Sequence, residues 1–194
     1  MPLYDPPASL DGFPSLSVSE QLYRIHRSDH EPLYLSNTGE SRFDLPAPRG
    51  TLYTAQTPVG AFLEVFRGRL IPSAEVAARS LTRLDPTGDP LSLADCTNPE
   101  ARGFGVTAAI HSTLDYDLTQ RWALAFADAG FDGIYYLVSH DPGATEHGIA
   151  LFAEVPTRPR LPIAGIGGIA STPIPDDLVA EVQRRFRLLV LPVR

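Results

Sequence analysis

The chain has 194 residues, 43% hydrophobic and 20% charged, a balance typical of a folded domain that buries a core. Its formal net charge of −7 argues against a protein that binds a nucleic-acid backbone, because such proteins need a basic face. The sequence has no apolar run of the roughly 18 residues that span a bilayer, no signal peptide at its N-terminus and one cysteine, Cys96, so we expect a cytoplasmic protein without disulfides, membrane contact or nucleic-acid contact.

The N-terminal quarter is predicted to be mostly irregular. Residues 1–19 have no hydrophobic period and are expected to form an arm ahead of one domain over residues 20–194. The sequence LYRIH, from Leu22, fits a short strand. A polar stretch from Arg27 to Arg49 follows and ends in the turn-rich sequence LPAPRG, after which Thr51–Ala55 has the threonine and tyrosine content of a strand.

A helix is predicted over TPVGAFLEVFRG. Thr57 fits the N-cap position, and Pro58 fits the first helical position, where a missing N–H costs nothing. The apolar residues fall at the spacing i, i+3, i+4 and i+7, which places them on one buried face: Val59, Phe62, Leu63 and Phe66.

The middle of the chain contains two more strand candidates and one strong helix. Residues 75–85 (EVAARSLTRLD) fit a strand, although their propensity fits a helix equally well, and residues 90–97 (PLSLADCT) fit a strand. The segment DYDLTQRWALAFADAGFDGI is predicted to be a helix that ends at Gly130. Its apolar stripe is expected to consist of Trp122, Ala125, Phe126 and Ala129.

The last third completes the prediction of fold class. Gly133–Val138 and Gly148–Val155 are expected to be strands joined by the loop SHDPGATEH. A turn-rich segment, a helix over Pro175–Arg185 and a final strand in LLVLPV follow. Strands outnumber helices and do not alternate with them, which favours an α+β fold: one domain with a mixed or antiparallel β core and flanking helices.

Several short motifs carry little functional weight. Ser139, His140 and Asp141 are consecutive, and neighbours along a strand point to opposite faces, so they are not expected to form a local triad. The sequence GIGGIA, residues 165–170, lacks the spacing of a dinucleotide-binding loop and is predicted to be a flexible turn. The five histidines are scattered and are expected to be solvated rather than bound to a metal, while Cys96 and Trp122 are expected in the core.

Arg42, Tyr53 and Glu64 are the most informative residues, and each is separated from the next by eleven positions. They place an arginine in a polar loop, a tyrosine in a strand and a glutamate among the apolar residues of a short helix. An apolar surrounding is unfavourable for a carboxylate unless it is paired or functional. The alternative is that Glu64 lies at the edge of the helix and reaches water.

The order of these motifs resembles the RES domain, a family named for its Arg, Glu and Ser. The family pattern has Gly-x-Arg-Trp-Asn, then Leu-Tyr, then Ala-x-x-Glu before an aliphatic residue, and later a serine after a Gly-Ile-Tyr-like strand. In this chain the corresponding positions are Ser41-Arg42-Phe43-Asp44, Leu52-Tyr53, Ala61-Phe62-Leu63-Glu64-Val65, Gly133-Ile134-Tyr135 and Ser139. The resemblance spans about Leu22 to Phe152.

The resemblance implies a fold similar to ADP-ribosyltransferases and an enzyme that consumes NAD, as toxins of bacterial toxin–antitoxin pairs with Xre-type antitoxins do. It implies that Glu64 stabilises the positive charge that develops on the ribose when the nicotinamide bond breaks. By the same resemblance Arg42 and Arg24 would hold the pyrophosphate or an attacking inorganic phosphate, Tyr53 would stack on nicotinamide or hydrogen-bond the ribose, and Ser139 would bind the amide or the ribose hydroxyls. NAD is then a substrate, and no cofactor is implied.

Alternatives remain for four points. Arg24 could form a surface salt bridge, and Ser139 could cap a strand. The acceptor of the ADP-ribosyl group could be phosphate, water or a macromolecule. Phe43 and Asp44 depart from the family's Trp and Asn. Phe43 keeps a stacking face, whereas Asp44 adds negative charge beside any phosphate, so a non-catalytic nucleotide-binding module on the same scaffold is the second hypothesis.

Overall fold

The computed structural model describes residues 2–155 and 165–192, in which an eight-stranded sheet and a two-stranded sheet are covered by short helices. The larger sheet has the order β1-β6-β7-β8-β3-β2-β5-β9, and the smaller one pairs β10 with β4. The strands are β1 (Ser15–Val18), β2 (Leu22–Arg27), β3 (Arg49–Ala55), β4 (Leu70–Pro72), β5 (Arg79–Pro86), β6 (Leu91–Asp95), β7 (Gly133–Leu137), β8 (His147–Glu154), β9 (Ile166–Pro173) and β10 (Leu189–Leu191). The helices are α1 (Pro58–Val65), α2 (Ser73–Ala77), α3 (Ala109–Ser112), α4 (Tyr116–Asp128) and α5 (Asp176–Phe186), with a 3-10 turn, η1, over Pro99–Phe104.

The larger sheet is mixed. Strands β6 and β7 pair in parallel, and the other neighbouring strands of this sheet pair antiparallel. The α+β prediction with a mixed β core is therefore confirmed. Among the described residues, no helix is long and apolar enough to cross a membrane.

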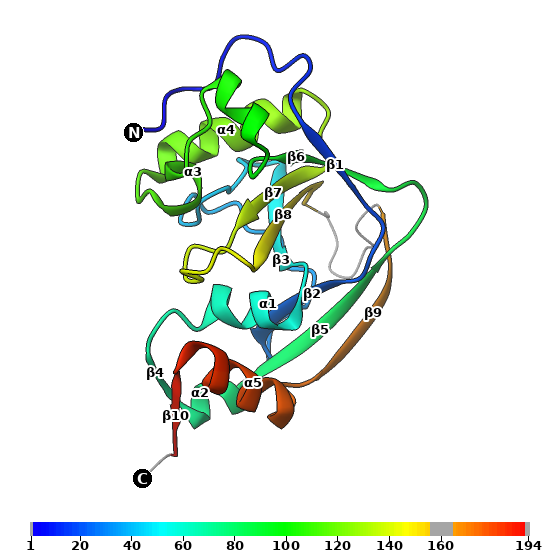
Figure 1. The fold of residues 1–194 in the computed structure, drawn as a ribbon. Coiled ribbons are helices and arrows are strands. Elements are labelled where there is room, and N and C mark those ends of the chain that lie inside the picture. Colours follow the sequence, from blue (N-terminus) through cyan, green and yellow to red (C-terminus); the bar gives the residue numbers. More distant parts are fainter. Residues whose placement is uncertain (1, 156–164, 193–194) are drawn as a thin grey trace.

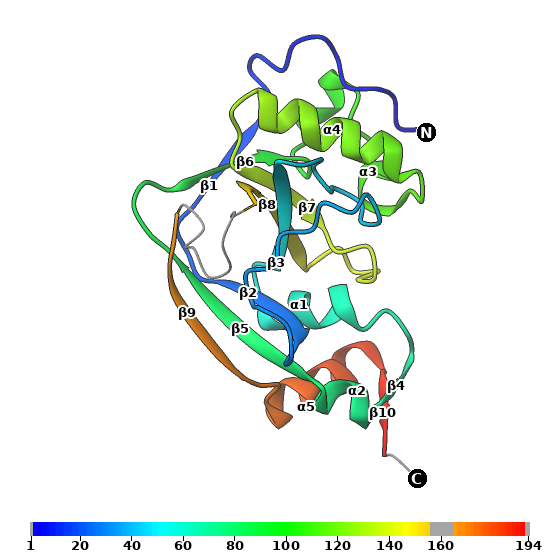
Figure 2. The same ribbon diagram turned by 180° about the vertical axis from the view of Figure 1, so that it is seen from behind.

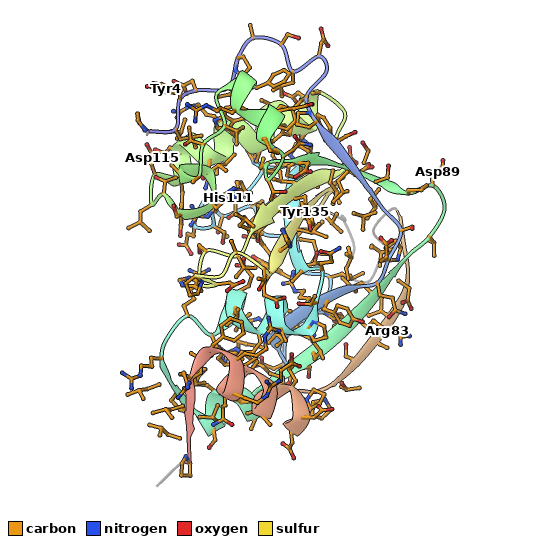
Figure 3. All side chains as sticks on the ribbon, in the orientation of Figure 1. Tyr4, Arg83, Asp89, His111, Asp115 and Tyr135 are labelled. Carbon is orange, nitrogen blue, oxygen red and sulfur yellow. The ribbon has the colours of Figure 1, made fainter. Side chains whose placement is uncertain are left out.

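The sheet curls, and helices α3 and α4 lie against one end while α1, α2 and α5 lie at the other (Figures 1 and 2). Alternating residues of the strands face opposite sides, as the twofold period of a strand requires. Ile134 and Tyr136 of β7 pack in the cluster that contains α4, whereas Tyr135 packs inside the curled sheet (Figure 3). A third cluster joins α1 and α5.

The prediction for α1 is confirmed in detail. Thr57 is the N-cap, its hydroxyl accepts a hydrogen bond from the Gly60 N–H at 2.9 Å, and Pro58 begins the helix. All four residues of the predicted apolar face are buried: Val59, Phe62, Leu63 and Phe66. Helix α4 also forms as expected and ends before Gly130, whose φ of +89° is a left-handed conformation that favours glycine.

Part of the predicted stripe on α4 is wrong. Trp122 and Phe126 are fully buried, but Ala125 is only half-buried and Ala129 is exposed. The buried side of the helix instead continues through Leu118 and Ala123. For residues 75–85 the sequence fits a strand or a helix equally well, and the structure contains both. The first three residues belong to helix α2, and the residues from Arg79 belong to strand β5.

Residues 1–19 are not a wholly irregular arm. Ser15–Val18 forms β1, which pairs antiparallel with β6, and Leu3 and Phe13 are buried in the core. Phe13 meets the ring of Phe126 edge-on with 4.8 Å between centroids. A four-residue strand between prolines and turns has too short a pattern for its period to be recognised.

Residues 165–170 are also not a flexible turn. From Ile166 they form β9, which pairs antiparallel with β5 along the edge of the sheet. Gly168 lies opposite Asp85, and a Cβ added to it would lie 2.4 Å from the carboxylate of that residue. Glycine permits this close approach but contributes no side chain to an alternating hydrophobic pattern. The sequence of β9 therefore does not predict a strand.

Candidate functional site

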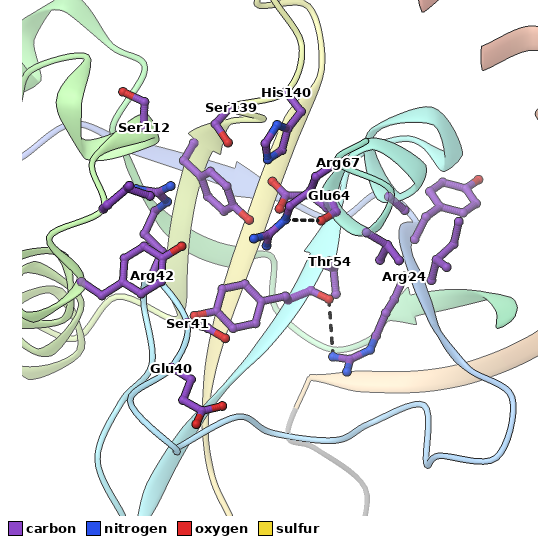
Figure 4. Close-up of a pocket in the computed structure, with 18 residues that line it drawn as sticks. Arg24, Glu40, Ser41, Arg42, Thr54, Glu64, Arg67, Ser112, Ser139 and His140 are labelled. Atoms are coloured by element: carbon purple, nitrogen blue, oxygen red, sulfur yellow. Dashed lines mark hydrogen bonds between the residues drawn. The ribbon is translucent and has the colours of Figure 1, made fainter. Parts of the chain in front are cut away.

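All five residues singled out in the sequence line one cavity of about 530 Å³. Arg24 comes from β2, Arg42 from the loop before β3, Glu64 from α1 and Ser139 from the turn after β7 (Figure 4). Tyr53 comes from β3. The structure thus brings together residues that are far apart in the sequence, whereas their chemical roles remain predictions.

Glu64 lies on the cavity side of α1 and is partly buried. Burial raises the pKa of its carboxyl group above the ordinary value, although the positive charges of Arg67 and Arg42 and a hydrogen bond from Tyr136 act in the opposite direction. Glu64 therefore faces the cavity and is neither fully buried nor fully exposed. A carboxylate held in a partly dry cavity beside two guanidinium groups is suited to stabilising a positive charge in a ligand.

Tyr136 contacts this carboxylate and is not among the site residues predicted from the sequence. Its side chain is buried, and its ring crosses β8 at Gly148, where an added Cβ would lie 2.3 Å from the ring. Gly148 is therefore needed for the tyrosine to reach Glu64. The motif Gly-Ile-Tyr-Tyr offers two adjacent tyrosines, and only the alternation of strand faces, combined with the position of α1, distinguishes Tyr136 from Tyr135.

Arg42 is held in the cavity by two contacts. Its guanidinium group donates to the carbonyl of Thr113 and lies over the ring of Tyr116, 5.4 Å from the centroid. Burial lowers the pKa of Arg42. Among the described residues these contacts use one donor, so the other N–H groups of the guanidinium can bind an anion.

Arg24 does not form the surface salt bridge that was the alternative reading. Its Nη1 donates to the carbonyls of Tyr34 at 3.2 Å and Tyr53 at 3.5 Å, and its buried Nε has no partner among the described residues. Burial lowers the pKa of Arg24 to about 10, which still leaves it charged at neutral pH. A buried, unpartnered donor of a charged group is a suitable ligand for an anion.

Arg67 is the third arginine of the cavity, and it too is not among the site residues predicted from the sequence. Its Nε donates to the backbone carbonyl of Glu64 at 3.2 Å. Within residues 2–155 and 165–192, no carboxylate lies within ion-pair distance of Arg24, Arg42 or Arg67. Their spacing of 18 and 25 residues carries no motif, so only the folded chain shows that they meet.

Tyr53 turns its ring, rather than a free hydroxyl, toward the cavity. The hydroxyl donates to Asp44 Oδ1 at 3.0 Å and accepts from the Phe43 N–H at 2.8 Å. Burial, and then the negative charge of Asp44, raise the pKa of this phenol well above its ordinary value. Of the two roles expected for Tyr53, the arrangement favours stacking over hydrogen bonding to a ribose.

Asp44 does not add negative charge to the cavity, contrary to expectation. It is buried, does not line the cavity, and organises the loop that carries Arg42. Its carboxylate accepts hydrogen bonds from Ser36 Oγ (2.9 Å), Thr38 Oγ1 (3.3 Å), Gly39 N (3.1 Å), Ser41 N (3.1 Å) and Tyr53 Oη (3.0 Å). An ionised carboxylate accepts at both oxygens, so it satisfies five donors where an amide could not.

Phe43 does not keep a stacking face for a ligand either. Its side chain is fully buried and meets Tyr136 edge-on, with 5.0 Å between ring centroids. Both departures from the family pattern are therefore structural, and neither reaches the cavity. The two substitutions therefore no longer argue for a non-catalytic nucleotide-binding module.

Ser139 and His140 are exposed residues of the turn after β7, and both line the cavity. The pKa of His140 is lowered by burial and by the nearby charges of Arg67 and Arg42. Asp141 points elsewhere, since its carboxylate accepts hydrogen bonds from Gly143, Thr145 and Glu146. The three consecutive residues thus form no triad, and no group of three or more metal-ligating side chains occurs in the part of the chain that the structure describes.

The raised pKa of Glu64 predicts an acid limb in any activity that needs its carboxylate. As the pH falls through the raised pKa the group takes up a proton and loses its charge, so activity should fall at a higher pH than an ordinary glutamate would give. A pH profile of kcat/KM between pH 4 and 8 measures this. A rate that stays constant down to the ordinary pKa of glutamate would contradict it.

The fold and part of the sequence have known counterparts. The family model described as RES domain matches residues 21–175. A chain in the crystal structure of the M. tuberculosis MbcT–MbcA toxin–antitoxin complex superposes with a TM-score of 0.64 and 19% sequence identity, over 90% of this chain and 94% of that chain. No curated protein sequence matches the chain.

Proposed function

The chain belongs to the RES domain family, and we propose that it is an enzyme that cleaves the bond between nicotinamide and ribose in NAD. The observation that carries the proposal is the partly buried carboxylate of Glu64 in a cavity with three arginines, none of which forms an ion pair with a carboxylate among the residues that the structure describes. An anionic ligand with a centre of developing positive charge matches this arrangement. NAD has both features, a pyrophosphate and a ribose that becomes positive as nicotinamide leaves.

In the proposed reaction the bond between C1′ and the nicotinamide nitrogen breaks, and nicotinamide leaves as a neutral molecule with the electron pair. Glu64 lowers the energy of the positive ribose through its charge, and the arginines hold the phosphate oxygens. The ring of Tyr53 is placed to stack against the nicotinamide. An oxygen nucleophile then forms the new bond to C1′.

The acceptor is identified by the products. Phosphate as acceptor gives ADP-ribose phosphate and makes the rate depend on phosphate concentration, whereas water gives free ADP-ribose with no such dependence. Transfer to a macromolecule instead adds the mass of ADP-ribose to a protein or nucleic acid. Mass spectrometry of a reaction with and without phosphate separates these three outcomes.

Arg42→Ala is expected to raise KM for NAD and to lower kcat, because contacts to phosphate act in both the ground state and the transition state. A charge-assisted hydrogen bond contributes about 1.5–3 kcal/mol, so kcat/KM should fall by roughly 10- to 100-fold. Arg121→Ala is the matched control, since Arg121 pairs with Asp5 outside the cavity. An unchanged KM would remove Arg42 from the binding role.

The proposal extends to a toxin with an antitoxin partner of the Xre type, NAD depletion being harmful to the cell that makes the enzyme. It is supported by family membership and by a similar fold within a toxin–antitoxin complex. Expression of the chain alone should arrest growth, and Glu64→Gln or co-expression of the neighbouring gene should each relieve the arrest. Harmless expression of an enzyme that cleaves NAD would remove the toxin role and leave the chemistry unaffected.

A further inference from the structure

Helix α5 follows the residues that match the RES family, which end at position 175. It lies next to α1, and its buried residues Leu178 and Val182 share a core cluster with Val59 and Phe62 of α1 (Figure 1). The helix that carries Glu64 is therefore packed against an element beyond the family match.

A buried carboxylate links α5 to the site. Glu146, at the end of the loop between β7 and β8, has only 5% of its side chain exposed. Its Oε1 accepts a hydrogen bond from Arg185 Nη2 of α5 at 2.8 Å, and its Oε2 accepts one from the hydroxyl of Thr57. Both carboxylate oxygens are thus used, and each partner comes from a different helix.

Thr57 connects this carboxylate to α1. Its side-chain oxygen accepts a hydrogen bond from the N–H of Gly60, and its hydroxyl group donates one to the carboxylate of Glu146. The N-cap residue of α1 is therefore bound both to its own helix and to Glu146. Glu64 lies one turn after Gly60. The position of the Glu64 backbone is in this way tied to the carboxylate of Glu146.

The same carboxylate ends the loop that carries Ser139 and His140. Asp141 makes this loop rigid, because its carboxylate accepts from Gly143 N (2.9 Å), Thr145 N (2.6 Å), Thr145 Oγ1 (2.8 Å) and Glu146 N (2.9 Å). The Val138 N–H donates to the carbonyl of Glu146 at 3.0 Å and closes the loop. A displacement of Glu146 would therefore move Ser139.

We infer that Arg185 is a positioning residue, which acts through Glu146 to hold the Ser139 loop and the Glu64 helix in a fixed relation. Without the guanidinium group, the buried carboxylate loses the arginine that pairs with it, and an uncompensated buried charge is strongly unfavourable. The carboxylate is then expected to move toward water, which loosens the loop at one side of the cavity. The effect on activity rests on the proposed function, whereas the effect on the loop does not.

The test compares Arg185→Ala with Arg184→Ala. The two arginines are neighbours in the last turn of α5, so both variants lose the same favourable charge at the helix end, but Arg184 does not contact Glu146. Arg185→Ala is expected to speed amide hydrogen exchange at residues 141–146 tenfold or more and to lower kcat/KM for nicotinamide release tenfold, measured well below the unfolding midpoint of each variant. Arg185→Lys should restore part of both.

Equal exchange in the two alanine variants would overturn the inference. If Arg185→Ala does not fold, the inference is tested by comparing Arg185→Lys with Arg184→Lys. Equal amide exchange and equal kcat/KM in these two variants would also overturn the inference. Wild-type protein that releases no nicotinamide would overturn the proposed function, and the exchange rates would then decide the role of Arg185 alone. Loss of activity in Arg185→Ala with unchanged loop exchange would also count against positioning through Glu146.

Discussion

Glu64→Gln is expected to lower kcat for NAD cleavage at least a hundredfold while the protein remains folded. The substitution preserves the shape of the side chain and its capacity to hydrogen-bond Tyr136, but removes the negative charge that in the proposed reaction stabilises the positive ribose. Removal of one electrostatic contact to a transition state typically costs about 10²–10³ in kcat. The measurement is nicotinamide release at saturating NAD.

Glu40→Gln is the matched control, because Glu40 also lines the cavity but is exposed. It should retain kcat within a few-fold. Near-wild-type turnover in Glu64→Gln would show that the carboxylate is structural.

Glu64→Gln should also raise the midpoint temperature of thermal unfolding at pH 7. Because the pKa of Glu64 is raised in the folded state, its charged form is disfavoured by folding, and the penalty is fully present above the raised pKa. The penalty is lost as the pH falls through that pKa toward the ordinary value. The two proteins should therefore differ at pH 7 and converge in acid.

Asp44→Ala is expected to lower the free energy of unfolding by about 3 kcal/mol, since it leaves five donors without their acceptor. It should also lower kcat/KM, because the loop that Asp44 organises carries Arg42 and because Tyr53 loses its fixed orientation. Urea unfolding monitored by Trp122 fluorescence measures the first effect.

Asp89→Ala is the control, since Asp89 lies exposed in the loop between β5 and β6 (Figure 3). It should change stability by less than about 0.5 kcal/mol. Asp44→Asn should be milder than Asp44→Ala, because one amide oxygen still accepts from the loop and its NH₂ group can donate to Tyr53. A stable Asp44→Ala protein with unchanged kcat/KM would contradict the role of this residue.

Elements with strong local signals were predictable from the sequence. Thr57 and Pro58 mark the start of α1, and four apolar residues at helical spacing mark its buried face. Gly130 marks the end of α4. Strand β9 and strand β1 were not predictable, because glycines in one and a four-residue length in the other leave no readable period. Their places are decided by pairing with β5 and β6.

The candidate site was predictable only in part. Arg42, Tyr53 and Glu64 were identified from a family pattern and from an unfavourable position for a carboxylate. Arg67 and Tyr136 were missed because nothing in their local sequence distinguishes them from surface and core residues. Asp44 was misjudged because a charge in a sequence does not reveal which way it faces.

Proton NMR of NAD incubated with the purified 194-residue chain, with and without inorganic phosphate, follows the proposed cleavage of the nicotinamide–ribose bond itself. We expect free nicotinamide to appear in proportion to the NAD lost in at least one of the two conditions, and we expect Glu64→Gln to abolish most of this release. NAD that stays intact in both conditions, with a protein shown by circular dichroism to be folded, would contradict the proposed function.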